Sequence, residues 1–300
     1  MKILITGSEG NIGKRLVSHL KNKGYDVYGI DHKQDFKPNY SVADIKNPLD
    51  LIRVFNEFKP EIVYHLAAMV SRVTCEASPS MTIETNVAGT NNIIQLCKQY
   101  DCRLINFSTS EVYGNIGGLL SESRTDLLPN NIYGLSKLLA EHIVNYELSN
   151  GLKAISVRPF MFYDEEETIG EHRSAMVRFC ERLLMGKRIQ VHTGSRRGWL
   201  HINDGVKVLE ALITCEWPLT MNIGNPNIVD TKFIAEYICK KLHLKYEDYV
   251  DETPLPEKMT LIKEADLSIQ KRIAPIEFEY DITRGINIVL YNVERRLKTN

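Results

Sequence analysis

The sequence predicts an α/β fold in which a doubly wound parallel sheet is followed by a smaller, irregular C-terminal lobe. Short apolar runs alternate with amphipathic stretches through the first half of the chain. A glycine-rich turn joins the first run to the first stretch, and the alternation stops after Pro159. Strands and helices that alternate at this spacing form a parallel sheet with helices on both faces, because crossovers between parallel strands are right-handed.

The individual elements follow from the apolar spacing and from glycine or proline at their ends. The run KILIT near the start is typical of a buried strand, and the amphipathic stretch after it ends at Gly24. Pro159 stops the last strand of the first half. We expect strands at 2–6, 26–31, 61–68 (continuing into a loop), 103–109 and 153–159, and helices at 11–24, 48–58, 82–100 and 131–150.

The second half is expected to be less regular, which fits a lobe that closes over a ligand. We expect loops at 164–174 and 251–258, helices at 175–186 and 204–213, and a strand at 188–192. The chain is therefore divided into a Rossmann-like domain at 1–160 and a mainly substrate-binding lobe at 161–300. Some segments of the lobe are expected to return to the sheet.

Composition excludes several classes of protein. The 300 residues are 43% hydrophobic and 25% charged, which suits a globular chain with a sizeable core. The formal net charge is -1 and no basic run interleaves with aromatic residues, so we expect no nucleic-acid or membrane partner. No apolar run approaches the ~20 residues that cross a bilayer, and a strand rather than a signal peptide opens the chain, which favours the cytoplasm.

The cysteine pattern also favours a cytoplasmic protein. The six are scattered, without a Cys-x-x-Cys pair. This spacing favours reduced, mostly buried thiols over disulfides or zinc, and no metal site is expected.

Gly7, Gly10 and Gly13 lie in the turn between the first strand and the first helix. Glycine lets the backbone approach a pyrophosphate, and the N–H groups at the helix start hold the anion. Asp31 ends the second strand, where a carboxylate accepts bonds from the adenosine ribose and repels a 2′-phosphate. The pattern predicts NAD rather than NADP, although Lys33 nearby weakens the preference. A structural turn beside a solvated aspartate is the alternative.

Tyr133 and Lys137 are four residues apart on one face of an expected helix. Tyrosine, with an ordinary pKa of ~10, is a poor base at neutral pH. A nearby ammonium or an oxidised nicotinamide ring stabilises the phenolate and lowers that pKa. The phenolate can then take a proton from a substrate hydroxyl while hydride leaves the same carbon. By itself, the pair also fits an exposed lysine beside a half-buried tyrosine.

Ser108, Thr109, Ser110 and Glu111 follow the strand expected at 103–109. Ligands of open α/β sheets bind at the carboxyl ends of the strands. Three hydroxyls and a carboxylate at this place can contact a polyol. A serine- and threonine-rich turn is the alternative, because such turns are common after strands.

Eight sequence features occur in the order and at the spacing of one family. They are GSEGNIG (7–13), Asp31, Asp44-Ile45, HLAA (65–68), NVAGT (86–90), STSEVYG (108–114), YGLSK (133–137) and VRP (157–159). Together they resemble the extended short-chain dehydrogenases/reductases, in the NAD-dependent epimerase/dehydratase group that acts on nucleotide sugars. The resemblance continues more loosely through RRGWLHINDGVKVLEAL (196–212). It implies a Rossmann-like fold, an NAD cofactor and a nucleotide-sugar substrate.

The resemblance also implies roles for individual residues. For the cofactor, Gly7, Gly10, Asn11, Ile12 and Gly13 hold the pyrophosphate, Asp31 holds the adenosine ribose, and Asp44 and Ile45 bracket the adenine. Leu66, Ala67 and Ala68 line the approach to the nicotinamide side, and Lys137 bonds the nicotinamide ribose. Ser108 and Tyr133 also contact the cofactor. For the substrate, Tyr133 is the base, Thr109 binds the sugar hydroxyl, and Arg197 meets a phosphate. Arg72 and Arg173 are further phosphate or sugar candidates, with solvated arginines as the alternative. Asn86 stabilises the active-site loop or helix.

Family members begin by oxidising the sugar C4 hydroxyl, and neighbouring groups decide the next step. Glu111 beside Thr109 and Ser110 resembles the 4,6-dehydratases and uronate decarboxylases, where a carboxylate acts as base or electrostatic organiser. Ser110 stands where many deoxy-sugar dehydratases have aspartate. An orienting role for Glu111, without acid–base work, is the alternative. A 4-epimerase, a 4-keto-sugar reductase that consumes added cofactor, and a non-catalytic NAD sensor remain alternative functions.

The segment after VRP departs from the family pattern in two ways. After VRP, Met161 replaces an asparagine that helps to hold the substrate, and acidic residues replace a Gly-Pro turn. The run Asp164–Glu167 is most simply a solvated loop.

The helices at 82–100 and 131–150 are apolar on more than one face, and family members commonly pair these helices, so we expect a homodimer.

Overall fold

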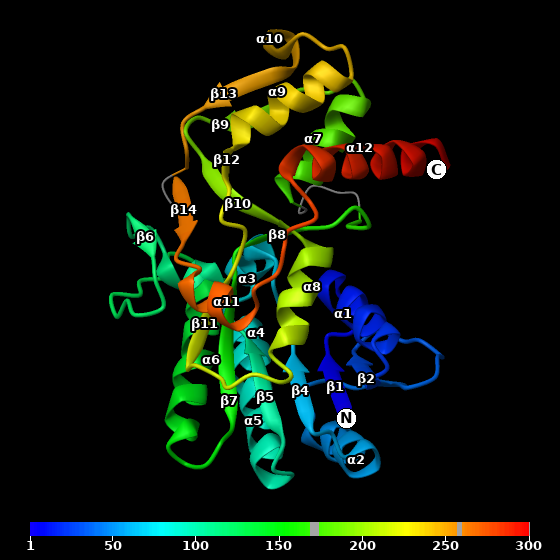
Figure 1. Ribbon diagram of the computed structural model, residues 1–300, viewed down its shortest axis with the longest axis vertical. Helices are drawn as coiled ribbons and strands as arrows, with labels where there is room; N and C mark the ends of the chain where they lie inside the picture. The colour runs from blue at the N-terminus through cyan, green and yellow to red at the C-terminus, as the bar shows by residue number, and fades with distance from the viewer. Residues whose placement is uncertain (169–173, 257–259, 300) are drawn as a thin grey trace.

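The computed structural model describes residues 1–168, 174–256 and 260–299. Its central feature is a seven-stranded sheet in the order β11-β7-β5-β4-β1-β2-β3 (Figure 1). All neighbouring strands of this sheet are parallel, which confirms the predicted fold class. Its strands are β1 (Lys2–Thr6), β2 (Asp26–Asp31), β3 (Tyr40–Val42), β4 (Ile62–His65), β5 (Arg103–Phe107), β7 (Ala154–Pro159) and β11 (Thr220–Ile223).

Helices cover both faces of the large sheet. Ile3 and Ile5 of β1 join the apolar cluster beneath α1 and α8, whereas Leu4 joins the cluster beneath α2, α5 and α6. Neighbouring residues of one strand thus face opposite layers, which explains why the strand is apolar throughout. The helices are α1 (Asn11–Asn22), α2 (Pro48–Phe58), α5 (Gly89–Gln99), α6 (Ile132–Leu148) and α8 (Ile202–Ala211).

A smaller part lies above the large sheet in Figure 1. It contains a mixed sheet in the order β12-β10-β14-β6, with β8 beside β10, and a parallel pair β13-β9. Helices α7, α9 and α12 pack around a third apolar cluster. The bounds are β6 (Leu119–Leu120), β8 (Met161–Tyr163), β9 (Ile189–His192), β10 (Arg196–His201), β12 (Ile228–Asp230), β13 (Val250–Thr253), β14 (Ile262–Ala265), α7 (Ala175–Leu184), α9 (Thr231–Lys241), α10 (Tyr246–Tyr249), α11 (Ser268–Ile273) and α12 (Ile282–Thr299).

The two parts exchange strands. From the second half of the chain, β11 completes the large sheet by pairing with β7, with Thr220 opposite Ser156. From the first half, β6 pairs with β14, with Leu120 opposite Ala265. A long-range pairing therefore fixes each part against the other.

The helix expected at 82–100 consists of three consecutive pieces. These are α4 (Pro79–Ile83), a π-helix η1 (Glu84–Ala88) and α5. Space is tight where α5 begins: a Cβ on Gly89 would lie 2.8 Å from the Cδ1 atom of Ile45, so a larger residue there would require this side chain to move. Two short helices remain, α3 (Arg72–Ala77) and the 3₁₀-helix η2 (Ser110–Tyr113).

The cysteines and the longer helices bear on whether the chain has disulfides or membrane spans. All six cysteines are free; five are buried and Cys215 is half-buried. Within the part of the chain that the structure describes, no helix has both the length and the apolar character to cross a membrane.

Candidate active site

The carboxyl ends of four parallel strands meet at one edge of the large sheet. The glycine turn at 7–13 follows β1, Asp31 ends β2, residues 66–68 follow β4, and residues 108–111 follow β5. The first turn of α6, with Tyr133, packs closely against η2: a Cβ on Gly134, the third residue of α6, would lie 2.8 Å from the Glu111 backbone oxygen. The structure thus brings the predicted cofactor and catalytic residues to a common edge.

The glycine turn has the geometry that the sequence predicted. Gly7 has a φ of 69°, and a Cβ there would lie 2.7 Å from the Ala67 backbone nitrogen. A Cβ on Gly13 would lie 2.2 Å from the Gly7 oxygen. Gly10 is the N-cap of α1 and has no side chain to cap the helix, so no capping side chain occupies the first N–H groups, which suits an anion.

Asp31 is 6% exposed at the end of β2. Its carboxylate accepts hydrogen bonds from the backbone N–H groups of Glu9 (3.0 Å) and Lys33 (3.1 Å). These bonds fix the carboxylate against the glycine turn. The Lys33 ammonium donates to the Glu9 carbonyl oxygen at 3.2 Å.

Two buried hydroxyls suit a polar ligand at this edge. The Oγ atoms of Ser8 and Ser108 have no hydrogen-bond partner among the described residues. Buried hydroxyls are normally paired, so both are available to a ligand that lies along the strand ends. Together with the first N–H groups of α1 and the carboxylate of Asp31, they fit the phosphates and hydroxyls of a dinucleotide.

The remaining predicted cofactor residues follow β1, β3 and β4. Asp44 accepts from the Lys46 backbone N–H at 2.9 Å, and Ile45 is buried against α5. The Ala67 N–H donates to the Thr6 hydroxyl at 3.1 Å. Asn11 is exposed, and Ile12, Leu66, Ala67 and Ala68 are partly buried.

Tyr133 and Lys137 lie in the first two turns of α6. The helix is capped by Asn131, whose side chain accepts from the Gly134 N–H at 2.8 Å. Tyr133 is partly buried and hydrogen-bonds to the side chain of Thr109. Lys137 is 1% exposed. The predicted pair therefore shares one helix face and reaches the Ser108–Glu111 turn.

The pKa of Tyr133 differs from the expectation. Burial raises it to about 12, the charge of Glu111 adds to the rise, and the hydrogen bond with Thr109 opposes it. The sequence predicted a lowered value beside Lys137. Burial also lowers the pKa of Lys137 to about 8, partly offset by Glu141. In the protein alone the phenol is thus a weaker acid than usual, so its activation depends on a positive charge brought by a ligand.

Glu111 is clasped by two donors. The Lys263 ammonium forms an ion pair with one carboxylate oxygen, and the Asn131 amide donates to the other at 3.0 Å. Burial opposes ionisation, but the charge and hydrogen bond of Lys263, with Arg72 and Asn131, outweigh it and lower the pKa of Glu111. Glu111 is therefore a carboxylate at neutral pH.

Lys263 is a candidate site residue that the sequence analysis missed. It lies on β14 and is 7% exposed, between the exposed Ile262 and Glu264. Burial lowers its pKa, and Glu111 opposes that shift. A single lysine in LIKEAD belongs to no motif, so only the pairing of β14 with β10 and β6 reveals where it points.

Arg197 and Arg72 lie on the same side of the site. Arg197, 6% exposed on β10, donates to the backbone oxygens of Arg196 (2.8 Å), Leu261 (2.7 Å) and Thr260. Arg72 begins α3, is partly buried, and acts electrostatically on Glu111 and Lys263. Arg173 falls outside the described residues.

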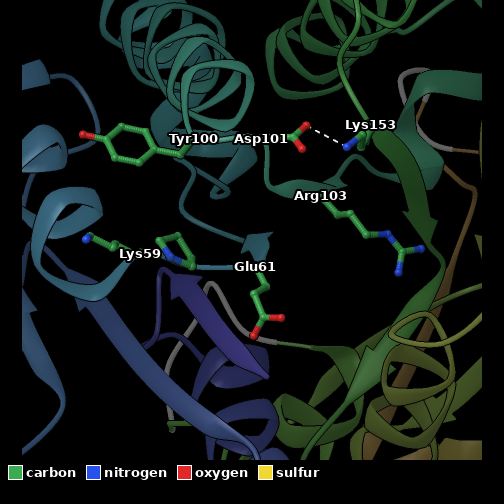
Figure 2. A pocket seen from close by; sticks show the side chains of 7 residues that line it. Lys59, Glu61, Tyr100, Asp101, Arg103 and Lys153 are labelled. Carbon is green, nitrogen blue, oxygen red and sulfur yellow. Dashed lines mark hydrogen bonds and ion pairs between the residues drawn. The ribbon is translucent and has the colours of Figure 1, made fainter.

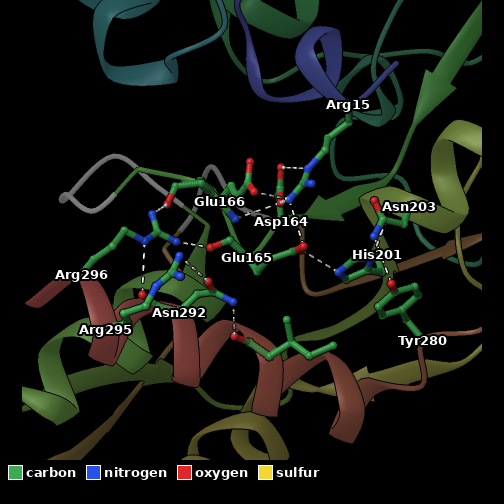
Figure 3. A network of polar contacts seen from close by, with 12 residues as sticks. Arg15, Asp164, Glu165, Glu166, His201, Asn203, Tyr280, Asn292, Arg295 and Arg296 are labelled. Atoms are coloured by element: carbon green, nitrogen blue, oxygen red, sulfur yellow. Dashed lines mark hydrogen bonds and ion pairs between the residues drawn. The ribbon is translucent and has the colours of Figure 1, made fainter. Parts of the chain in front are cut away.

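The acidic run after β8 is not a solvated loop, which corrects the expectation for Asp164–Glu167 (Figure 3). Arg15 of α1 donates to both oxygens of Asp164 (3.2 and 2.8 Å) and lies 2.9 Å from Glu165. His201 pairs with Glu165 at 2.9 Å, and Arg296 of α12 donates to backbone oxygens of the run. Asp164 is consequently 4% exposed and Glu167 8% exposed. Cations from distant elements hold the run in place, a fact that local composition does not reveal.

A hollow of about 510 Å³ lies at the opposite edge of the sheet, where strands begin (Figure 2). Three of its charged side chains are held by contacts within the protein. Lys153 pairs with Asp101 at 2.7 Å, and Arg103 donates to the backbone oxygens of Ile213 and Cys215. The hollow contains none of the predicted site residues, and we assign the chemistry to the carboxyl edge.

Comparison with known proteins adds the family. The model of the NAD-dependent epimerase/dehydratase family matches residues 3–224. The chain belongs to this family. It is therefore an NAD-dependent enzyme of the epimerase/dehydratase class, and the resemblance stated from the sequence is confirmed.

Individual members of the NAD-dependent epimerase/dehydratase family show how far the likeness extends. The chain is 27% identical over 322 residues to UDP-glucuronic acid decarboxylase 6 of Arabidopsis thaliana, covering 99% of this chain and 90% of the relative. It is 26% identical over 351 residues to dTDP-glucose 4,6-dehydratase of Salmonella typhimurium, covering 98% and 94%. The crystal structure of UDP-glucose 4-epimerase from Thermus thermophilus in complex with NAD matches with a TM-score of 0.84 at 23% identity, covering 98% and 99%. These relatives carry out three different reactions, so membership does not select one of them.

Proposed function

We propose that this enzyme decarboxylates a nucleotide-linked uronate after transient oxidation of the sugar at C4. The observation that carries the proposal is the buried ion pair between Glu111 and Lys263, with Arg72 and Arg197 beside it. Lys263, Arg72 and Arg197 place three positive charges around one carboxylate, at a place of low solvent access. Cations grouped in this way favour a substrate that brings its own anions, here a diphosphate and a uronate carboxylate.

The first step is the oxidation of the C4 hydroxyl. Tyr133 accepts the hydroxyl proton at its phenolate oxygen, while Thr109 orients the same hydroxyl. Bound NAD would take the hydride from C4 and return it to the ketone at the end of the cycle, and its positive ring would favour the phenolate. Lys137 stabilises the phenolate and holds the nicotinamide ribose. We assign cofactor binding to the predicted residues at 1–160 and sugar-nucleotide binding mainly to the second half.

Decarboxylation then follows from the chemistry of a 4-ketone. The C5–C6 bond breaks, carbon dioxide leaves, and the electron pair moves into the enolate between C5 and C4. Thr109 donates to the enolate oxygen. The Lys263 ammonium, a better acid because burial lowers its pKa, returns a proton to C5. Glu111 orients the ammonium and remains a carboxylate throughout.

A 4,6-dehydratase is the second candidate. The lowered pKa of Glu111 suits a base that removes the C5 proton. That reaction also needs an acid for the departing C6 hydroxyl, and the neighbouring Ser110 provides a hydroxyl where many dehydratases have an aspartate. The uronate reaction needs no such acid, which is why we place it first.

One panel separates these reactions. The enzyme with NAD is incubated with UDP-, GDP-, dTDP- and CDP-linked hexoses and uronates, and the products are analysed by mass spectrometry. The proposal expects loss of carbon dioxide from a uronate. Loss of water from a hexose would establish the dehydratase instead, and an isomer of unchanged mass the epimerase. Turnover that consumes added reduced cofactor would establish the reductase, and no turnover would favour the sensor.

We also propose that the enzyme is a cytoplasmic homodimer. Helix α6 exposes Leu135 (40%), Leu139 (38%) and Tyr146 (68%) along one side. Val73 of α3 and Met81 of α4 are exposed as well (61% and 53%). Apolar side chains repeated on one helix side favour a protein contact, and the free thiols suit a reducing compartment. Sedimentation that finds a monomer at micromolar concentration would contradict the dimer.

A further inference from the structure

A chain of buried hydrogen bonds links the strand edge to the catalytic helix through His65. The Thr6 hydroxyl lies 2.8 Å from His65 Nδ1, and His65 Nε2 lies 2.9 Å from the Thr90 hydroxyl. The Thr90 hydroxyl donates to the Asn86 backbone oxygen at 2.7 Å. His65, Thr6, Thr90 and Asn86 are all 0% exposed. These bonds join β1, β4, η1 and α5.

The proton positions follow from counting donors. Thr90 has one hydroxyl proton and gives it to Asn86, so its oxygen accepts from His65 Nε2–H. His65 Nδ1 is then unprotonated and accepts from Thr6, whose oxygen also accepts from the Ala67 N–H. A neutral ring is required, and burial together with the charge of Lys137 lowers the pKa of His65 to about 3.

The chain continues into α6 through Asn86. Its amide donates to the Ser136 hydroxyl at 2.9 Å, and Ser136 donates to the Tyr133 backbone oxygen at 2.7 Å. The Asn86 side chain also accepts from the Met69 N–H at 2.7 Å and donates to the Met69 backbone oxygen at 2.9 Å. Asn86 lies in the π-helix η1, a geometry that often marks functional positions.

We propose that His65 is a positioning residue for catalysis. Its ring is a rigid spacer with one donor and one acceptor, so it fixes the distance between the cofactor edge at Thr6 and Ala67 and the helix that carries Tyr133. Loss of either bond leaves a buried polar group unpaired and allows α6 to shift against the strand ends. The inference rests on the proposed catalytic role of Tyr133 and Lys137, and it holds for any of the candidate sugars.

The matched variants Thr90→Val and Thr90→Ser test this role. Valine keeps the shape and removes the hydroxyl, whereas serine keeps the hydroxyl. Thr231→Val is the control, because Thr231 is also buried and its hydroxyl also donates to one backbone oxygen (Ser195, 3.0 Å), but in the smaller part of the molecule. The substrate is the nucleotide sugar that the panel identifies, and kcat and KM are measured well below the melting temperature of every variant.

We expect Thr90→Val to lower kcat about tenfold with little change in KM, since one buried unpaired donor costs about 1–3 kcal/mol. Thr90→Ser should recover most of the rate, and Thr231→Val should lose stability but keep kcat. Wild-type kcat in Thr90→Val, or an equal loss in Thr90→Ser, overturns the proposal. A Tyr133→Phe variant that keeps its rate instead overturns the catalytic assignment.

Nitrogen-15 NMR of the histidine side chains gives a readout that needs no turnover. The inference expects His65 to stay neutral with its proton on Nε2 from about pH 5 to 8, with a slowly exchanging N–H. The Nε2–H signal should exchange faster in Thr90→Val. Protonation of His65 within that range, or an Nδ1–H tautomer, overturns the proposal even if the sugar substrate is still unidentified.

Discussion

Lys137 places a buried positive charge about one helical turn from the proposed base. It is 1% exposed, and its neighbour Glu141 is held by Arg158 through bonds of 3.0 and 2.7 Å. The charge of Glu141 is therefore shared, and burial dominates the pKa of Lys137, which falls to about 8. A cation with a lowered pKa destabilises the folded state wherever it is protonated.

We expect Lys137→Met to raise stability while abolishing turnover. The folded protein releases the Lys137 proton near pH 8 and the unfolded chain near pH 10.5, so the gain is full below pH 8 and fades as the pH rises towards 10.5. The gain should be on the order of 2 kcal/mol at pH 7. Urea unfolding of both proteins at pH 7 and pH 9.5 measures it. A variant less stable than the parent at pH 7 would contradict this explanation.

Lys263 should set the charge state of Glu111 during turnover. Lys263→Met removes the proposed proton donor to C5, and the pKa of Glu111 should rise because the carboxylate loses its ion-pair partner. We expect kcat to fall about a hundredfold, as for other buried electrostatic donors, without weaker NAD binding. Lys263→Arg should retain part of the rate. Lys271→Met, at an exposed lysine, is the control. An equal loss of kcat in this variant would contradict the role assigned to Lys263.

At the scale of single residues, the sequence predicted the positions of those that belong to local motifs. Tyr133, Lys137 and Thr109 lie where their spacing placed them, because a helix face and a strand end are set by a few neighbouring residues. Lys263 could not be predicted in this way, since its role depends on a strand pairing across the whole chain. The raised pKa of Tyr133 also escaped prediction, because burial is a property of the folded neighbourhood.

At the level of elements, Arg15 fastens α1 to the segment after β8. Arg15→Met would leave Asp164, 4% exposed, without its two guanidinium bonds. We expect a loss of about 1–3 kcal/mol in urea unfolding, the range for a buried charge that loses a partner. Lys14→Met is the matched control, because Lys14 is 61% exposed and lies 3.7 Å from its partner Glu9. A control loss as large as that of Arg15→Met would refute the role of this contact.

Elements of the first half were predicted more closely than those of the second. The strand at 2–6 and the helix at 48–58 have their predicted bounds. The strand is recognised as a short continuous apolar run, and the helix as apolar residues at a helical period. The sequence did not predict β10, β12 or β14. These strands have three to six residues and irregular burial, so alternation is too short to read.

For the whole molecule, the exchanged strands predict one cooperative unit. The apolar cluster beneath α1 includes Leu209 of α8 and Met221 and Ile223 of β11, all from the second half. Residues 1–160 alone would expose that face of the sheet. We expect the isolated fragment to lack a cooperative urea transition and the full chain to unfold in one step. A fragment with a sharp transition would show that the first half folds independently.

The pairing of β11 with β7, and of β14 with β6, joins the two halves of the chain, and local sequence patterns do not show it. Sequence periodicity predicts a strand at a given segment, whereas its partner is chosen by the packing of the complete chain. The sequence therefore predicted a sheet and its ligand edge, and the structure added the pairing of β14 with β10 that brings a cation to Glu111.

The most direct test of the central claim uses a nucleotide-linked uronate with carbon-13 in its C6 carboxylate. The enzyme is incubated with this substrate and NAD, and the released gas and the remaining sugar are analysed by mass spectrometry. The account predicts labelled carbon dioxide and a pentose nucleotide from the parent enzyme, and neither from Tyr133→Phe. Label retained in the sugar of a turned-over product, or equal release by Tyr133→Phe, would contradict it.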